Sequence, residues 1–252
     1  ESAARMDAML PAYFGRLPKL PYNVEPVPDA IAPGYTTGRY VEGDPEEGRH
    51  GIYWVNTYAL EQRPLYELPA LTAHEAVPGH HLQIALSQEM SNQPKFRQDY
   101  YATAFGEGWG LYSEYLAGEA GMYQTPYERF GGLSMEMWRA CRLVADTGLH
   151  WYGWTREQAE ACFKDNSALA PLNIDIEVTR YMGWPGQAVA YKVGELKIRE
   201  LRAAAKAALG DDFDIRAFHD AVLEEGAIPL DVLDTRVRAW IAGQQAEPPA
   251  AP

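Results

Sequence analysis

The segment at residues 71–83 is the feature that most constrains the fold, because it gathers ionisable side chains around a Pro-Gly pair. It reads Leu-Thr-Ala-His-Glu-Ala-Val-Pro-Gly-His-His-Leu-Gln, so His74 and Glu75 precede the pair and His80 and His81 follow it. The apolar residues around them favour a buried helix. Histidines on one helical face, with a glutamate after the first, are typical of zinc sites in which the glutamate activates a water molecule. The segment therefore indicates a metal site on a buried helix.

The spacing departs from the usual His-Glu-x-x-His pattern, because the position four residues after His74 is Pro78, which cannot bind metal. On an undistorted helix His80 lies about 9 Å along the axis from His74, and His81 about 10.5 Å, both too far to share a tetrahedral ion. Proline and the glycine after it break regular helix. We therefore expect a distorted turn between Val77 and His80 that makes His80 the second ligand, with His81 ranked next. The alternative is a set of hydrogen-bonded histidines at a helix end.

The third ligand candidate, Glu107, lies between two glycines in a helix expected at about 94–116. Each glycine costs about 1 kcal/mol relative to alanine inside a helix, and close approach of another helix is a reason to accept that cost. Such an approach would bring the Glu107 carboxylate to the metal. The alternative is a solvated acid. Glu114, seven residues later on the same face, is placed to bind the other nitrogen of a histidine ligand.

Composition limits the function classes. The chain has 252 residues, of which 47% are hydrophobic, enough for the core of one large or two small domains. Its net charge of −13 argues against a nucleic-acid partner held by phosphate contacts. We expect no membrane span, because no apolar run approaches ~18 residues, and the first residues do not resemble a signal peptide. The first residue is not methionine, so we expect a processed or excised piece. Cys141 and Cys162 are expected in the core, and a disulfide between them is left open.

Everything after about residue 65 has a helical pattern, which predicts a mostly α fold with one minor sheet. A first helix is expected within residues 1–20, and 34–41 could pair with the β-branched and aromatic segment 52–58 in a small antiparallel β-sheet. We expect one catalytic domain over residues 1–252, with a disordered tail at 244–252. The other helices are expected at 65–91, 94–116, 126–151, from 155 to 166 with a capping box, 173–206 with a break at Pro185-Gly186, 213–224 and 230–241.

Two later groups are candidates for catalysis. Arg142, Asp146 and His150 follow one another at four-residue steps, so they lie along one helical face. They form either an ion-pair ladder or a pair in which Asp146 orients His150 toward the substrate. Tyr181, beside Arg180, precedes the Pro-Gly break, and a tyrosine hydroxyl can stabilise an oxyanion by roughly 3–4 kcal/mol. A core tyrosine is the default interpretation, since the chain has 16 tyrosines.

Together these segments resemble the bacterial family known as "domain of unknown function 885" (DUF885), a branch of the gluzincin metallopeptidases. The resemblance rests on His74-Glu-Ala-Val-Pro-Gly-His80, Glu107-Gly-Trp-Gly-Leu-Tyr112, Asp146-Thr-Gly-Leu-His150 with Gly153-Trp-Thr155, and Arg180-Tyr181 followed by Pro185-Gly-Gln-Ala188. It implies a helical catalytic half similar to that of neurolysin and angiotensin-converting enzyme. It also favours His80 over His81 as a ligand.

Members of this family are generally about twice as long, which implies that the chain is the C-terminal, zinc-bearing half. A missing N-terminal half would then form the other wall of a substrate channel. The resemblance also implies that Tyr181 stabilises the oxyanion, and that the strand at 52–58, with Asn56 as a substrate-binding candidate, holds an extended peptide. Export, to the periplasm in a bacterium, is common in the family.

The sequence thus predicts a zinc-dependent peptidase acting on a peptide or small amide substrate. His74, His80 and Glu107 would hold Zn²⁺, while Glu75 would move the proton and Tyr181, with His150, would steady the oxyanion. Around them we expect His81, Glu114, Asp146, Arg180 and Asn56. The rivals are a zinc amide or ester hydrolase with a non-peptide substrate, and a non-catalytic binding protein with a vestigial site. Retention of Glu75 argues against the second rival.

Overall fold

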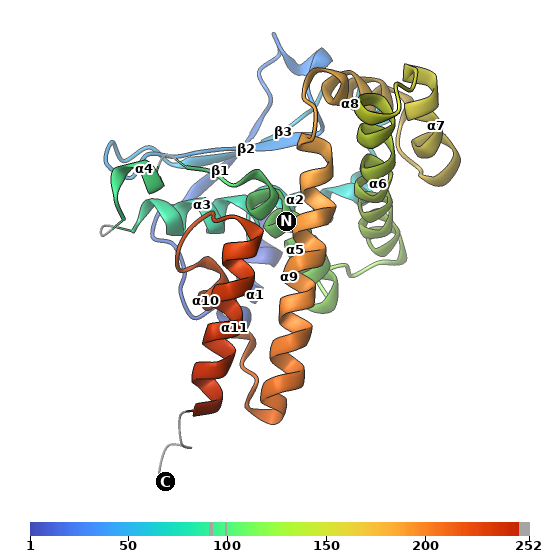
Figure 1. Cartoon of the computed structure of the whole chain (residues 1–252). Helices are drawn as coiled ribbons and strands as arrows, with labels where there is room; N and C mark the ends of the chain where they lie inside the picture. Colours follow the sequence, from blue (N-terminus) through green and yellow to red (C-terminus); the bar gives the residue numbers. More distant parts are fainter. Residues whose placement is uncertain (91–92, 99, 247–252) are drawn as a thin grey trace.

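The computed structural model describes residues 1–90, 93–98 and 100–246, which form a mostly helical molecule with one small sheet (Figure 1). The mostly helical fold class is therefore confirmed. Within the described residues, none of the helices combines the length and the apolar character that a membrane crossing would require.

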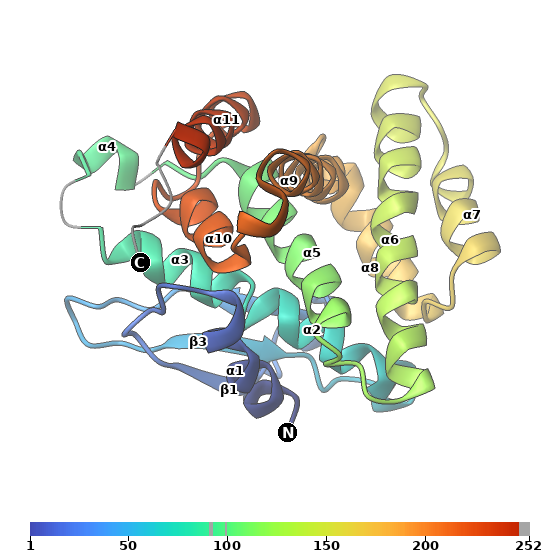
Figure 2. The ribbon, with the colours of Figure 1, turned by 90° about the horizontal axis from the view of Figure 1, so that it is seen from below.

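The sheet has three strands, β1 (Tyr22–Pro26), β2 (Gly38–Val41) and β3 (Gly51–Val55). Strand β2 pairs antiparallel with β3, as expected, but β1 pairs parallel with the other side of β3, so the order is β1-β3-β2. The expected antiparallel sheet is thus corrected to a mixed one. The pattern missed β1 because it is a short strand within a stretch rich in proline, glycine and acid. In Figure 2 the sheet lies below α2 (Leu68–Glu75) and α3 (His80–Gln88).

The remaining helices follow the expected pattern, including the break at Pro185-Gly186, with three boundary corrections. The expected helix at 65–91 is divided into α2 and α3, and the one at 94–116 is divided into α4 and α5. Residues 244–246 of the expected disordered tail belong to a helix, and 247–252 lie outside the described residues. The break at Pro185-Gly186 separates α8 from α9. The helices are α1 (Ser2–Tyr13), α4 (Lys95–Gln98), α5 (Thr103–Glu119), α6 (Pro126–Trp151), α7 (Arg156–Asn166), α8 (Pro171–Gly183), α9 (Gln187–Leu209), α10 (Ile215–Leu223) and α11 (Leu230–Ala246).

Helix α5 runs through the core and contacts α2, α3, α6 and α9 (Figure 2). Its large side chains Phe105, Trp109, Tyr112 and Leu116 have no exposed surface. Burying each such side chain stabilises the fold by roughly 1.5–3 kcal/mol. Because α5 is held on several sides, the groups that it carries have fixed positions.

Glycines allow α5 and α9 to cross at short range. A Cβ atom at Gly108 would lie 2.5 Å from the Cα atom of Gly194, so neither position has room for a side chain. This close approach is the reason that we expected for a glycine beside Glu107.

A second cluster of buried apolar residues lies around α6, α7 and α8, and includes Met135, Trp138 and Phe163. Cys141 of α6 and Cys162 of α7 form a disulfide with Cα atoms 5.7 Å apart. The capping box at the start of α7 is present, because the side chains of Thr155 and Gln158 each accept a hydrogen bond from the other residue's backbone.

Replacing Gly108 with alanine should lower the free energy of unfolding by about 1–3 kcal/mol, because the added methyl group overlaps the α9 backbone. Gly243 of α11 is the matched control, since a Cβ atom there meets nothing within 4 Å. Gly243→Ala should raise stability by about 0.5–1 kcal/mol. Urea unfolding measures both, and a Gly108→Ala protein as stable as the unmodified one would contradict the packing described here.

Candidate metal centre

The turn between α2 and α3 brings two histidines together. Helix α2 ends at Glu75, and the backbone at Ala76 leaves the helical region, with φ −94° and ψ −111°. Pro78 has no N–H to continue the helix. The indole nitrogen of Trp109 donates to the carbonyl oxygen of Pro78 at 2.8 Å, which fixes the turn against α5. As a result the rings of His74 and His80 lie 4.7 Å apart between centroids. The distorted turn expected before His80 is therefore present.

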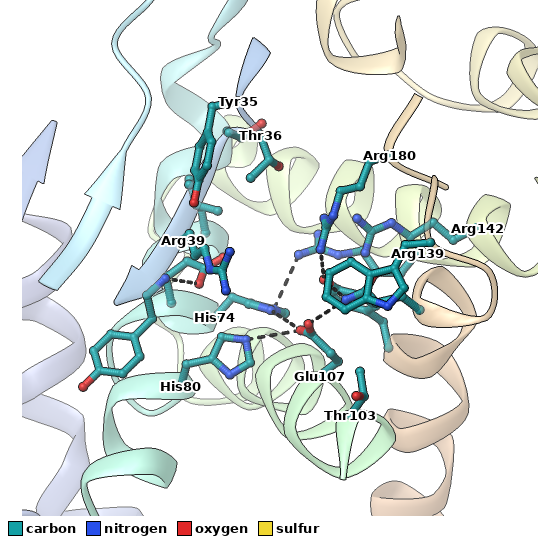
Figure 3. A pocket seen from close by; sticks show the side chains of 18 of the residues that line it. Tyr35, Thr36, Arg39, His74, His80, Thr103, Glu107, Arg139, Arg142 and Arg180 are labelled. Carbon is teal, nitrogen blue, oxygen red and sulfur yellow. Dashed lines mark hydrogen bonds and ion pairs between the residues drawn. The ribbon is translucent and has the colours of Figure 1, made fainter. Parts of the chain in front are cut away.

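The structure brings His74, His80 and Glu107 to one point (Figure 3). Glu107 Oε2 lies 3.5 Å from His74 Nε2 and 3.2 Å from His80 Nε2, and the three ligand atoms are all within 4.8 Å of one another. Atoms about 2.0 Å from a tetrahedral zinc ion lie roughly 3.3 Å from each other. Glu107 Oε2 is also buried and has no hydrogen-bond partner among the described residues. The donor set therefore fits a zinc ion that keeps a fourth position open.

Glu114 orients the first histidine. Its Oε1 atom lies 2.8 Å from His74 Nδ1 and also accepts a hydrogen bond of 2.7 Å from Arg139 Nη2. The carboxylate keeps the proton on Nδ1, which leaves Nε2 free to bind a metal. On α5, Gly110 makes room for the ring, because a Cβ atom there would lie 2.7 Å from His74 Nε2.

The charges of the cluster depend on one another. Burial alone would lower the pKa of His74, but its contacts with the Glu107 and Glu114 carboxylates outweigh burial and raise the pKa to about 9. Burial would raise the pKa of Glu107, but its ion-pair contacts with the two histidines hold that pKa well below its usual range. In the metal-free protein a proton on His74 thus compensates the carboxylates, and a bound cation would replace it.

Glu75 lies beside this cluster and lines the same cavity of about 530 Å³. Its Oε2 atom accepts a hydrogen bond of 2.8 Å from the backbone nitrogen of Tyr40 in β2. The sheet thus fixes one carboxylate oxygen and leaves the other for a reacting group.

His81 does not join the cluster. Its Nδ1 atom lies 3.0 Å from the hydroxyl of Tyr40, and its ring packs against Tyr22. Burial lowers the pKa of His81 to about 4, so the ring is neutral. His81 holds the sheet to α3.

Tyr181 does not lie where its expected role in stabilising the oxyanion would require. Its side chain is buried, and its hydroxyl accepts hydrogen bonds from Trp138 Nε1 at 2.9 Å and Arg142 Nε at 2.8 Å. It is not among the residues that line the cavity. Tyr181 is therefore a core residue that supports Arg142, which corrects the expected oxyanion contact.

His150 and Asp146 also lie apart from the cavity, which corrects their expected pairing. His150 is exposed, and its Nε2 atom lies 2.9 Å from the carbonyl oxygen of Tyr181. Asp146 instead accepts hydrogen bonds from the backbone nitrogen of Gly186 at 3.1 and 3.2 Å. Asp146 therefore fixes the turn between α8 and α9, and the three residues do not form an ion-pair ladder.

Asn56 and β3 have structural roles in place of the expected contacts with a peptide. The side-chain nitrogen of Asn56 donates to the carbonyl oxygens of Ala32, Tyr35 and Thr36, which holds the loop that forms one wall of the cavity. Strand β3 is the central strand, so its backbone is already paired on both sides. The strand that lines the cavity is β2.

Two residues that sequence reasoning did not assign to the site, Tyr191 and Gln187, lie at its centre. The Tyr191 ring stacks against His74, with centroids 5.8 Å apart. Gln187 Nε2 donates to Glu107 Oε1 at 2.9 Å and to the Tyr191 hydroxyl at 3.2 Å, and that hydroxyl also accepts from Arg180 at 3.3 Å. The available signal was their four-residue spacing after the Pro-Gly break.

Comparison with known proteins supports the resemblance noted above. The family model described as "Bacterial protein of unknown function (DUF885)" matches residues 1–237. The chain belongs to the DUF885 family. A comparison with curated proteins gave no match for this DUF885 chain.

Two solved structures share the DUF885 chain's fold. One is "the putative lipoprotein from Colwellia psychrerythraea", with 42% identity and a TM-score of 0.93 over 96% of this chain. The other is "a putative lipoprotein of unknown function from Shewanella oneidensis", with 23% identity and a TM-score of 0.76 over 92% of this chain. The DUF885 chain spans 42% and 43% of those two chains, respectively.

Replacing His80 with alanine should remove bound zinc, because it deletes one of three ligands. His81→Ala is the matched control, since that neighbouring histidine lies outside the cluster and should leave near-stoichiometric zinc. Mass spectrometry of the zinc-loaded proteins measures the metal content. Equal zinc in both variants would rule out His80 as a ligand.

Glu114→Gln should weaken zinc binding by about 10- to 100-fold, because the amide orients His74 less strongly than the carboxylate does. Glu119→Gln provides the comparison, as Glu119 is also a glutamate of α5 paired with an arginine, Arg202, but away from the site. Competition with a chromogenic chelator gives the two affinities. If both variants bind zinc as the unmodified protein does, Glu114 has no influence on the metal.

Proposed function

We propose that the protein is a zinc-dependent hydrolase of peptide bonds, of the gluzincin type. The observation that carries this proposal is the convergence of two histidines and a glutamate at the wall of a cavity, with Glu75 beside them. A structural zinc site would be closed by four protein ligands, whereas a catalytic one leaves a position for water.

The chain's own residues supply binding and proton transfer. His74, His80 and Glu107 would hold the ion, which when bound lowers the pKa of a water molecule toward 7 and polarises the substrate carbonyl. Glu75 would accept a proton on its free oxygen as a water oxygen bonds to the substrate carbonyl carbon, and would donate that proton to the amine as the C–N bond breaks. The hydrogen bond from Tyr40 keeps the other oxygen in place throughout.

Tyr191 takes the role that we expected of Tyr181. Its hydroxyl lies at the cavity wall, next to the stacked His74 ring, and is oriented by Gln187 and Arg180. A preorganised hydroxyl donor there would stabilise negative charge on the substrate oxygen.

An extended peptide fits the outer edge of β2. The backbone nitrogen of Tyr40 points away from β3, because it bonds Glu75, and alternation along the strand makes Gly38 point the same way. A peptide lying along this edge would pair with Gly38 by main-chain hydrogen bonds and place its carbonyl near the cluster.

Export of the protein is part of the proposal. Two similar structures are each described as a "putative lipoprotein", and the Cys141–Cys162 disulfide suits an oxidising compartment. Both similar chains are more than twice as long, and we propose that a further helical half completes the substrate channel in the whole protein.

The proposed function is tested by incubating the zinc-loaded protein and its Glu75→Gln variant with a mixture of synthetic peptides. We expect cleavage by the unmodified protein and a loss of roughly 100- to 10,000-fold in the variant, because glutamine cannot accept the proton. Zinc content should stay the same. Mass spectrometry detects the products.

The control variant is Glu42→Gln, which changes an exposed glutamate of the same cavity without touching the cluster. It should keep most of the activity. Equal activity of the Glu75→Gln and unmodified proteins would contradict the assigned mechanism, and the absence of any cleavage would contradict the peptidase function.

A further inference from the structure

Four arginines line the cavity: Arg39, Arg139, Arg142 and Arg180. None of them belongs to the metal cluster of His74, His80 and Glu107. In Figure 3 the side chains of Arg139, Arg142 and Arg180 come together on one side of the cavity, while Arg39 lies on the other. An acidic protein with a net charge of −13 has thus concentrated cations in one place.

The charges on the arginine side are not balanced. Arg139 is paired with Glu114 at 2.7 Å, and Arg142 with Glu177 at 2.5 Å. Within the described part of the chain, Arg180 pairs only with the same Glu177 carboxylate, at 3.5 Å. In these ion pairs three guanidinium groups share two carboxylates, so Arg180 has the most distant counter-charge of the three.

Burial shows which of these three arginines a ligand can reach. The side chains of Arg139 and Arg142 are 3% and 2% exposed, whereas that of Arg180 is 28% exposed. Arg142 also has a buried nitrogen, Nη1, with no hydrogen-bond partner among the described residues. Of the three, Arg180 is thus the accessible cation, and Arg142 adds its positive charge from behind.

Arg180 is close to the metal ligands. Its Nη2 atom donates to the Tyr191 hydroxyl at 3.3 Å, Gln187 Nε2 lies 3.2 Å from that hydroxyl, and the same nitrogen is 2.9 Å from Glu107 Oε1. Three consecutive contacts therefore connect it to the cluster. An extended peptide advances about 3.3 Å per residue, so a group bound by Arg180 lies within a few residues of the cleaved bond.

We propose that Arg180 is the centre of a subsite for a substrate carboxylate, with Arg142 adding charge from behind. An arginine can bind a carboxylate through two parallel hydrogen bonds. The contacts with Tyr191 and Glu177 already hold the Arg180 guanidinium group in place. The carboxylate is either the free C-terminus of a peptide or an acidic side chain near the cleaved bond. This inference rests on the proposed peptidase function, to which it adds a substrate class.

The test measures binding and not cleavage. The zinc-loaded Glu75→Gln protein is titrated by calorimetry with three probes: acetylated tetraalanine as the free acid, the same peptide as its C-terminal amide, and an acetylated tetrapeptide amide with one internal glutamate. We expect at least one carboxylate-bearing peptide to bind about 10-fold or more tightly than the tetraalanine amide. Preference for the free acid identifies the C-terminus as the source, and preference for the glutamate peptide identifies the side chain.

Variants of Arg180 in the same protein complete the test. Arg180→Gln should remove the preference for the carboxylate and leave binding of the amide unchanged, while Arg180→Lys should keep part of it. The matched control is Arg156→Gln. Arg156 lies on α7, is 31% exposed and pairs with Asp175 of α8, the helix that carries Arg180, but it does not line the cavity. It should keep the full preference.

Equal affinities for the three probes would overturn the proposal, and that comparison needs no arginine variant. A preference that survives in Arg180→Gln would overturn it as well. Neither result depends on turnover, so a protein that prefers carboxylates but cleaves no peptide would contradict the proposed function and leave the subsite in place.

Discussion

The close packing of α5 against its neighbours is the constraint on which the rest of the structure depends. At Gly108 it meets the α9 backbone, and at Gly110 it leaves only enough space for the His74 ring. Larger residues at these positions would push α2 and α9 away. Glu107 would then no longer reach the two histidines, and Gln187 would no longer reach Glu107.

The same packing explains why the metal cluster draws on three separate elements. Helix α2 supplies His74, helix α3 supplies His80, and α5 supplies Glu107. Trp109 of α5 bonds the Pro78 carbonyl in the turn between the two histidines, so the break in the helix is held in a single conformation. Preorganised ligands of this kind bind a metal without first having to be ordered.

Sequence patterns predicted the cluster better than its surroundings. Pro78 and the histidine six residues after His74 indicated a broken helix, and glycines on both sides of Glu107 indicated a close neighbour, so local chemistry predicted that these three side chains converge. The choice between Tyr181 and Tyr191 depends instead on how α8 and α9 are oriented across the turn at Gly186. Helical periodicity within one segment gives no information about the orientation of two helices. For a similar reason β1 was missed, because a short strand without a clear alternating pattern is defined mainly by its partner.

The central claim is that His74, His80 and Glu107 form an open zinc site. X-ray absorption at the zinc edge of the loaded protein tests it most directly. The account predicts four nitrogen and oxygen ligands at about 2.0–2.1 Å, with the scattering of two imidazole rings, in both the unmodified protein and the His81→Ala variant. Zinc bound with fewer than two imidazoles, or with the same spectrum after His80 is replaced, would contradict it.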